Sequence, residues 1–226
     1  MMQRAMAPAL ARLAVAAAWT LAAAAQTPTP PPIPEKAVKP AQFVPTGWEL
    51  EQQKAADLNG DGLADALLLM RRSQASGTPE RILAIVLRQR GKSGYVLSEM
   101  NTRLIPSSSD AKQEDPMADG ELIVRRGGFD IKLTLLSGIG SYQTATLRYR
   151  FRYQDSCFRL IGYDRMETNR GTLETRDVSI NFLTGAVVRR AGNAQSDAAK
   201  EQHEKLKTNA RRCFAELESA AAFNPS

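Results

Sequence analysis

The chain has 226 residues, of which 43% are apolar and 24% are charged, with two cysteines and one histidine. This composition excludes a collagen-like chain and a highly charged disordered chain, and it fits one globular domain. The histidine, His203, and the scattered carboxylates form no catalytic constellation that spacing alone identifies, so the sequence by itself indicates no activity.

Residues 1–25 have the pattern of a secretory signal peptide. Two arginines precede an apolar run of 13 residues, which ends in three alanines before Gln26. A helix that spans a bilayer needs about 20 apolar residues, so cleavage near Gln26 is favoured over a permanent membrane anchor. We therefore expect an exported protein, periplasmic or secreted, with no transmembrane segment in the mature chain. Cleavage would lower the net charge from +6 to +4, which is too low to indicate a nucleic-acid partner.

The next segment, 26–42, is predicted to be a proline-rich linker. Six of the fifteen residues from Gln26 to Pro40 are prolines, which favour an extended backbone and lack a backbone donor. The remaining chain, 43–226, is long enough to bury one core. We expect a single β-rich domain there.

From residue 64 onward, short apolar or alternating runs are separated by clusters of Gly, Asn, Asp and Ser, which is typical of successive antiparallel strands. Asp155 and Ser156 predict a tight hairpin, and the segment Arg103–Gly120 predicts a long loop. The expected strands are Ala64–Met70, Arg81–Arg88, Gly94–Met100, Leu122–Arg125, Phe129–Leu136, Thr144–Gln154, Cys157–Met166, Leu173–Phe182 and Ala186–Arg189. The predicted fold class is therefore mainly β, as a single antiparallel β domain.

The C-terminal segment 196–218 is expected to form an amphipathic helix on this domain. Apolar residues recur there at helical spacing, namely Leu206, Ala210, Cys213, Phe214 and Leu217. Cys213 would lie on the apolar face of the helix, where it could reach Cys157 on a strand. An oxidising compartment favours a disulfide between these two cysteines, with two separately buried thiols as the alternative.

One motif carries recognisable chemistry, the run from Asp57 to Asp65. Oxygen-bearing side chains stand at positions 1, 3, 5 and 9, which are Asp57, Asn59, Asp61 and Asp65, and a glycine stands at position 6. Calcium is a hard cation that takes about six to eight oxygen ligands. We therefore expect calcium as the cofactor of this loop, with the backbone carbonyl of Leu63 and water completing the ligand set. A turn with solvated acids is the alternative.

The motif is not an EF-hand, because position 12 is Leu68 rather than a glutamate and a strand-like apolar run follows. Residues 55–69 resemble instead the calcium loop of FG-GAP repeats, as found in integrin α-chain propellers, where the loop lies between two strands. The resemblance implies that the carboxylates and the amide of the run Asp57–Asp65 are the side-chain ligands. A propeller needs about four or more repeated blades and the sequence contains no second copy, so a complete propeller is not expected.

A wider resemblance extends over about residues 43–190. The order of six segments is similar to that in a family of small exported bacterial proteins of unknown function. These segments are FVPTGW (43–48), the loop at 57–65, ERIL (80–83), YRFRY (149–153), FRLIGYD (158–164) and SINFLTG (179–185). The resemblance implies an exported, mainly β domain and supplies no catalytic residues.

A row of arginines is expected on one face of the strand Thr144–Gln154, because Arg148, Arg150 and Arg152 alternate with apolar residues. With a two-residue turn after this strand, Arg159 would lie opposite Arg152 on the same face. Such a row could bind an anionic polymer such as lipopolysaccharide or an acidic glycan. The alternative is a solvated face whose arginines pair with acids of neighbouring strands.

These observations favour a non-enzymatic, calcium-binding module that is exported and meets an unidentified envelope or extracellular partner. The alternative is a periplasmic hydrolase of envelope glycans, which would need paired carboxylates such as Asp115, Asp119 and Glu121 in and beside the predicted long loop. His203 has no evident Cys, Ser or acid partner in the sequence, and we expect an ordinary half-exposed histidine.

Overall fold

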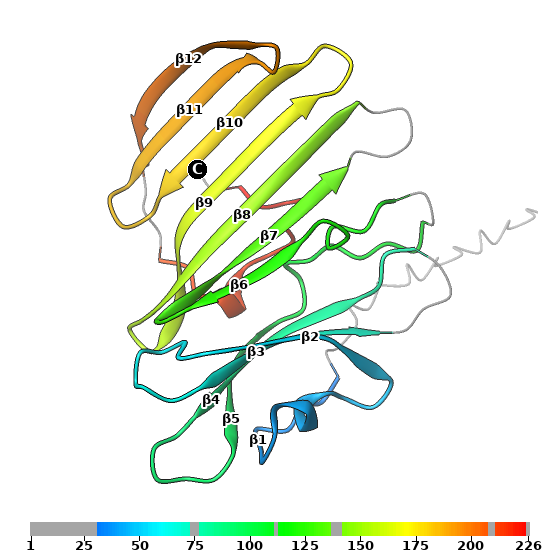
Figure 1. Ribbon diagram of the computed structural model, residues 1–226, viewed down its shortest axis with the longest axis vertical. Coiled ribbons are helices and arrows are strands. Elements are labelled where there is room, and N and C mark those ends of the chain that lie inside the picture. Colours follow the sequence, from blue (N-terminus) through cyan, green and yellow to red (C-terminus); the bar gives the residue numbers. More distant parts are fainter. Residues whose placement is uncertain (1–30, 73–76, 111–112, 137–141, 208–210, 225–226) are drawn as a thin grey trace, which may run out of the picture. The chain divides into compact units, whose positions relative to one another are not determined.

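The computed structural model describes residues 31–72, 77–110, 113–136, 142–207 and 211–224. The predicted mainly β, antiparallel architecture is confirmed, and the strands form two sheets (Figure 1). The described part of the chain contains no helix with the length and apolar character that a membrane crossing requires.

The first sheet has five strands in the order β1-β5-β4-β3-β2. Two of them, β3 and β4, have runs of six consecutive buried residues, as continuous apolar segments between turns predict. A short 3-10 turn, η1 (Pro40–Phe43), connects β1 to β2. The strands are β1 (Lys36–Ala37), β2 (Trp48–Ala56), β3 (Asp65–Arg72), β4 (Arg81–Arg88) and β5 (Tyr95–Asn101).

The second sheet has seven strands, each paired with its neighbour in sequence. The predicted hairpin between β8 and β9 is confirmed: Asp155 and Ser156 have positive φ angles of 51° and 65°, as a type I′ turn requires. The register then places Arg152 opposite Arg159, as expected. The strands are β6 (Glu121–Arg125), β7 (Gly128–Leu136), β8 (Gln143–Gln154), β9 (Cys157–Asn169), β10 (Glu174–Asn181), β11 (Ala186–Asn193) and β12 (Ser196–Lys205).

The main core joins residues of both sheets. Leu67 and Leu69 of β3 belong to the same buried cluster as Phe129 of β7 and Phe151 of β8. The other face of β3 and β4 packs in a second cluster that includes Phe43. Two sides of the five-stranded sheet are therefore covered, which explains why its central strands read as uninterrupted apolar runs.

The predicted C-terminal helix at 196–218 is wrong. Ser196–Lys205 is strand β12, which pairs with β11 at the edge of the seven-stranded sheet. Beyond it, the described chain contains a single 3-10 turn, η2 (Phe214–Glu216), while Ala210 lies outside the described residues. A helix over 196–205 would have almost no apolar face to bury.

Pairing with β11 gives the same polar residues another source of stability. As strand β12, residues Ser196–Lys205 form hydrogen bonds with backbone donors and acceptors of β11 that would otherwise face solvent. Oppositely charged side chains also meet across the two strands, with Arg190 Nε 2.5 Å from Glu201 and Arg189 Nε 3.3 Å from Glu204.

The C-terminal segment after β12 packs on the main core, where Phe214, Leu217 and Ala220 are buried. Its position is secured by the disulfide between Cys157 and Cys213, which confirms the predicted pairing. The backbone continues this contact, because the N–H of Leu160 donates to the carbonyl of Arg212 over 2.9 Å.

The folded unit begins before the predicted boundary at residue 43 and extends over residues 31–226. Strand β1 pairs with β5, and the N–H of Leu97 donates to the carbonyl of Glu35 at 2.8 Å. Part of the predicted linker 26–42 is therefore the edge of the five-stranded sheet. Prolines lack a backbone N–H donor. They are compatible with a sheet edge, because the outer side of an edge strand pairs with no other strand.

Candidate functional site

The nine-residue run Asp57–Asp65 connects β2 to β3 (Figure 1). Gly60 and Gly62 both have positive φ angles, of 83° and 88°. This left-handed conformation is strained for residues with a Cβ, so the two glycines allow the chain to reverse within the run. The loop therefore winds tightly, as the sequence predicts.

The last acid of the motif, Asp65, anchors the loop to the sheet. Its carboxylate is 1% exposed. Oδ2 accepts the N–H groups of Leu58 at 2.9 Å and Asn59 at 3.4 Å, and Oδ1 accepts that of Arg88 at 2.9 Å. Burial raises the pKa of Asp65 in spite of these hydrogen bonds, which act in the opposite direction.

The other oxygens of the motif lie near one another around the turn. Asp57 Oδ2 accepts the N–H of Gly62 at 3.0 Å. Asn59 Oδ1 accepts the N–H of Asp61 at 3.0 Å, and Asp61 Oδ2 accepts a hydrogen bond from Asn59 Nδ2 at 3.1 Å. Asp57 Oδ1 is buried and has no hydrogen-bond partner in the described structure. One oxygen of the loop is thus desolvated without compensation, which is unfavourable unless a ligand or water satisfies it.

The donor set is only partly assembled for a cation. Among the described residues, no three His, Cys, Asp or Glu side chains are grouped so that they could hold a metal ion. The amide oxygen of Asn59 and backbone oxygens would have to contribute alongside the carboxylates. Such a mixed set of oxygens is what calcium sites use.

A second element contacts the loop directly. The turn between β6 and β7 donates the N–H of Gly127 to the carbonyl of Asp57 over 2.8 Å. In the same turn, Arg126 Nε lies 3.4 Å from Asp57 Oδ2. The guanidinium of Arg90, in the turn between β4 and β5, donates to the carbonyl of Asp61 at 3.0 Å. The Asp57–Asp65 loop therefore lies at a junction between the two sheets.

The predicted arginine row lies on β8, but its members differ in their contacts. Arg148 pairs with the fully buried carboxylate of Asp130 at 2.7 Å, and Arg150 pairs with Asp164. For Arg152 the described residues provide no ion pair, and its side chain is exposed. Pairing with neighbouring acids, the alternative weighed from sequence, thus holds for two of the three arginines.

The candidate hydrolytic acids do not share one environment. Asp115 accepts two hydrogen bonds of 2.7 Å from the buried guanidinium of Arg81, which also binds Glu51 at 2.7 Å. Burial alone would raise the pKa of Asp115, but the hydrogen bonds and charge of Arg81 lower it overall. Asp119 and Glu121 are exposed.

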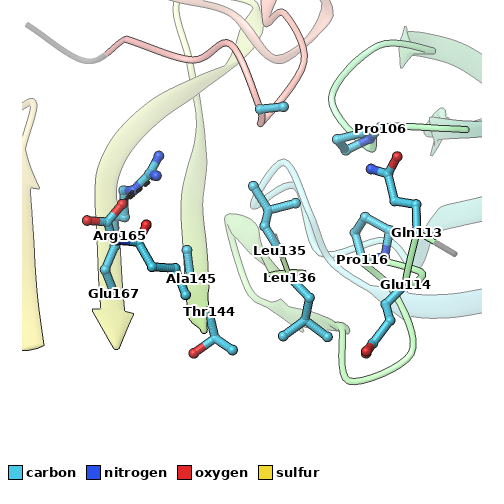
Figure 2. A pocket seen from close by; sticks show the side chains of 12 residues that line it. Pro106, Gln113, Glu114, Pro116, Leu135, Leu136, Thr144, Ala145, Arg165 and Glu167 are labelled. Carbon is cyan, nitrogen blue, oxygen red and sulfur yellow. Dashed lines mark hydrogen bonds and ion pairs between the residues drawn. The ribbon is translucent and has the colours of Figure 1, made fainter. Parts of the chain in front are cut away.

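A pocket of about 190 Å³ lies beside the long loop, at the ends of β7, β8 and β9 (Figure 2). Figure 2 shows Leu135 and Leu136 between Glu114 of the loop and the pair formed by Arg165 and Glu167 of β9. Arg165 Nε donates to Glu167 at 2.6 Å. None of the three acids expected from the sequence lines this pocket.

His203, the one histidine of the chain, lies on β12 rather than on a helix, and its side chain is 72% exposed. Its Nε2 lies 2.8 Å from Glu201 on the same strand. No cysteine or serine completes a catalytic group with this pair in the described contacts, so an ordinary surface histidine agrees with the structure.

Sequence reasoning missed the arginines that precede β7, Arg125 and Arg126. Arg125 ends β6 and Arg126 lies in the following turn, where it contacts Asp57, about 70 positions away in the sequence. The signal that could have identified them is the run Arg-Arg-Gly-Gly at 125–128, between two apolar strands. Comparisons with models of protein families, with curated proteins and with solved structures found no match to this chain.

Proposed function

We propose that this protein is an exported, non-enzymatic binding or envelope-associated module whose β2–β3 loop takes up calcium. The observation that carries the proposal is the buried Oδ1 of Asp57, which has no hydrogen-bond partner in the described structure. Calcium bound there would compensate the desolvation of this oxygen.

The chemistry of the loop supports calcium rather than a softer metal. Carboxylate, amide and backbone oxygens are the ligands that calcium prefers, whereas zinc and copper favour the nitrogen and sulfur of His and Cys. The residues that would hold the ion are Asp57, Asn59, Asp61 and Asp65, with the carbonyl of Leu63. Neutralising three carboxylates in one turn would favour the folded geometry of the loop.

Export is supported by two independent features. Residues 1–25 have the composition of a signal peptide, and the two cysteines of the chain form a disulfide, a bond that is rare in reducing compartments. Amino-terminal sequencing of the protein recovered from a periplasmic fraction tests this part, with a new terminus near Gln26 as the expected result.

The non-enzymatic character is supported by the state of Asp115, one of the three candidate acids in and beside the long loop. An acid catalyst in glycoside hydrolysis needs a raised pKa, whereas Arg81 lowers the pKa of Asp115. Asp115 is therefore poorly suited to be the proton donor that the hydrolase hypothesis requires.

Thermal unfolding with calcium and with a chelator tests the calcium site. At a calcium concentration of about 100 times Kd, binding stabilises the folded state by about 2.7 kcal/mol, which raises Tm by about 5–10 °C for a chain of this size. Asp61→Ala should abolish this calcium-dependent shift, whatever its effect on the baseline Tm. Asp119→Ala, which removes an exposed acid outside the loop, should retain it. A wild-type Tm that is identical with calcium and chelator would reject the calcium site.

A further inference from the structure

A depression of about 260 Å³ lies on the outer side of the seven-stranded sheet, next to the turn between β6 and β7. Four of its lining residues are arginines, from the end of β6, from this turn and from β8, and none of the described lining residues is acidic. We call it the arginine depression. Its lining consists of Arg125, Arg126, Gly127, Gly128, Arg150, Phe151, Arg152 and Ile161.

Two carboxylates beside the depression hold its guanidinium groups in place. Asp130 on β7 is 0% exposed, and it pairs with both Arg125 and Arg148. Asp164 on β9 pairs with Arg150. Buried or partly buried acids that bind a guanidinium restrict its orientation, so the donors on this side are preorganised rather than free to rotate.

The backbone around the depression also leaves space between the arginine side chains. Gly128 approaches β8 so closely that a Cβ there would lie 2.1 Å from the carbonyl oxygen of Phe151. A β-bulge, seen as a register shift between Arg150 and Phe151, leaves Ile161 of β9 without a paired residue on β8. Bulges re-aim side chains and are frequent beside functional sites. Gly128, which has no side chain, and the bulge together leave a hollow between the arginines.

Positive charge exceeds negative charge in this region. Five guanidinium groups, Arg125, Arg126, Arg148, Arg150 and Arg152, face the carboxylates of Asp57, Asp130 and Asp164. Burial lowers the pKa of Arg125, and the nearby charges of Arg148 and Arg150 lower it further. Mutual repulsion of this kind is relieved when an anion enters.

We propose that the arginine depression binds a phosphate or sulfate group. Guanidinium groups match the oxygens of such anions in a bidentate manner, and this depression collects them from two separate hairpins. The site differs from the row expected on β8, because Arg148 does not line the depression, while Arg125 at the end of β6 and Arg126 of the turn do. Arg126 and Arg152 are exposed and, among the described residues, have no buried acid as a partner, so these two would contact the anion.

Arginine side-chain NMR signals test the site. In ¹⁵N-labelled protein with chelator present, sodium phosphate or sodium sulfate replaces sodium chloride at constant ionic strength. We expect saturable shifts of several arginine Nε–Hε signals, and an affinity about tenfold lower or weaker still in the double variant Arg126→Gln/Arg152→Gln. Arg176→Gln is the matched control, since Arg176 is an exposed arginine of β10 outside the depression. It should bind like the wild type.

Shifts that do not saturate, or that are unchanged in the double variant, would overturn the proposal. Because calcium is absent, failure here leaves the calcium site untouched. Sedimentation with phosphatidylglycerol vesicles, against phosphatidylcholine vesicles, then identifies the source of the anion. Binding that requires Arg126 and Arg152 indicates a lipid headgroup, while NMR shifts without vesicle binding indicate a free or polymer-borne phosphate or sulfate.

Discussion

Arg126 Nε lies 3.4 Å from Oδ2 of Asp57, so a residue that lines the arginine depression is paired with a carboxylate of the Asp57–Asp65 loop. The side chain of Arg126 is 79% exposed and that of Asp57 is 18% exposed. An ion pair with so exposed a partner contributes little to stability, but it sets the position of Arg126. A calcium ion bound to Asp57 would replace the ion pair with Arg126. The side chain of Arg126 would then be free to bind an anion in the depression.

The ion pair between Arg126 and Asp57 predicts positive coupling between the two proposed sites, calcium at the loop and an anion at the depression. Sulfate should bind about 1.4- to fivefold more tightly with calcium than with chelator, since an exposed ion pair is worth about 0.2–1 kcal/mol. Calorimetric titration of sulfate under both conditions measures the ratio. By linkage, sulfate should tighten calcium binding by the same factor. In Arg126→Gln the ratio should fall to one, and an unchanged ratio in that variant would contradict the coupling.

The ion pair between Arg81 and Asp115 predicts a defined pH dependence. The folded-state pKa of Asp115 is lowered from its usual 3.8, so its contribution to stability is present above pH 3.8 and is lost as the pH falls through the lowered value. Asp115→Asn should cost about 1.5–3 kcal/mol at pH 6, as expected for a hydrogen bond to a charged group. Urea unfolding of both proteins between pH 2 and pH 6 should show this difference shrinking toward the acid end. A constant difference across that range would exclude the charged pair as its origin.

The disulfide between Cys157 and Cys213 is expected to stabilise the fold strongly. The two cysteines are separated by 56 residues, for which chain entropy gives about 4 kcal/mol. Chemical denaturation of Cys157→Ser/Cys213→Ser should show a loss of this order. The same variant should increase hydrogen exchange of Phe214 and Leu217, because the bond ties the C-terminal segment to β9. Exchange that matches the oxidised wild type would show that packing alone holds this segment.

Packing of the C-terminal segment has its own test in Phe214, which is 0% exposed. Its ring lies 5.5 Å from that of Phe129 and 5.4 Å from that of Phe151. Phe214→Ala should therefore cost about 3–5 kcal/mol. Met166→Ala is a suitable control, because Met166 is 51% exposed and should change stability by less than about 0.5 kcal/mol. Equal losses in the two variants would argue against the described core.

Apart from the edge strand β6, the strands that sequence reasoning identified are inner ones. From β3 to β11 each expected strand is present within a few residues of its predicted ends, because strands with a buried face alternate apolar and polar residues or form continuous apolar runs. The strands that were missed, β1, β2 and β12, all lie at sheet edges. An edge strand gains stability from backbone hydrogen bonds to one neighbouring strand and can be polar throughout. Its sequence therefore shows little hydrophobic periodicity.

The error at 196–218 has the same physical origin. The spacing of acids and bases there suits a helix, with Glu201 four residues before Lys205. The structure uses Glu201 across the sheet instead, in a pair with Arg190. Local propensity could not show that β11 offers an open edge.

By itself, the sequence determined the mainly β class, the β8–β9 turn and the pairing of two cysteines in one chain, since periodicity, turn chemistry and an even count of thiols are local or compositional signals. The division into two sheets was decided only by tertiary structure, as were the commitment of Arg148 to Asp130 and the meeting of Arg126 with Asp57. Such contacts join residues distant in the chain, and they depend on how apolar faces bury one another rather than on any motif that a linear pattern contains.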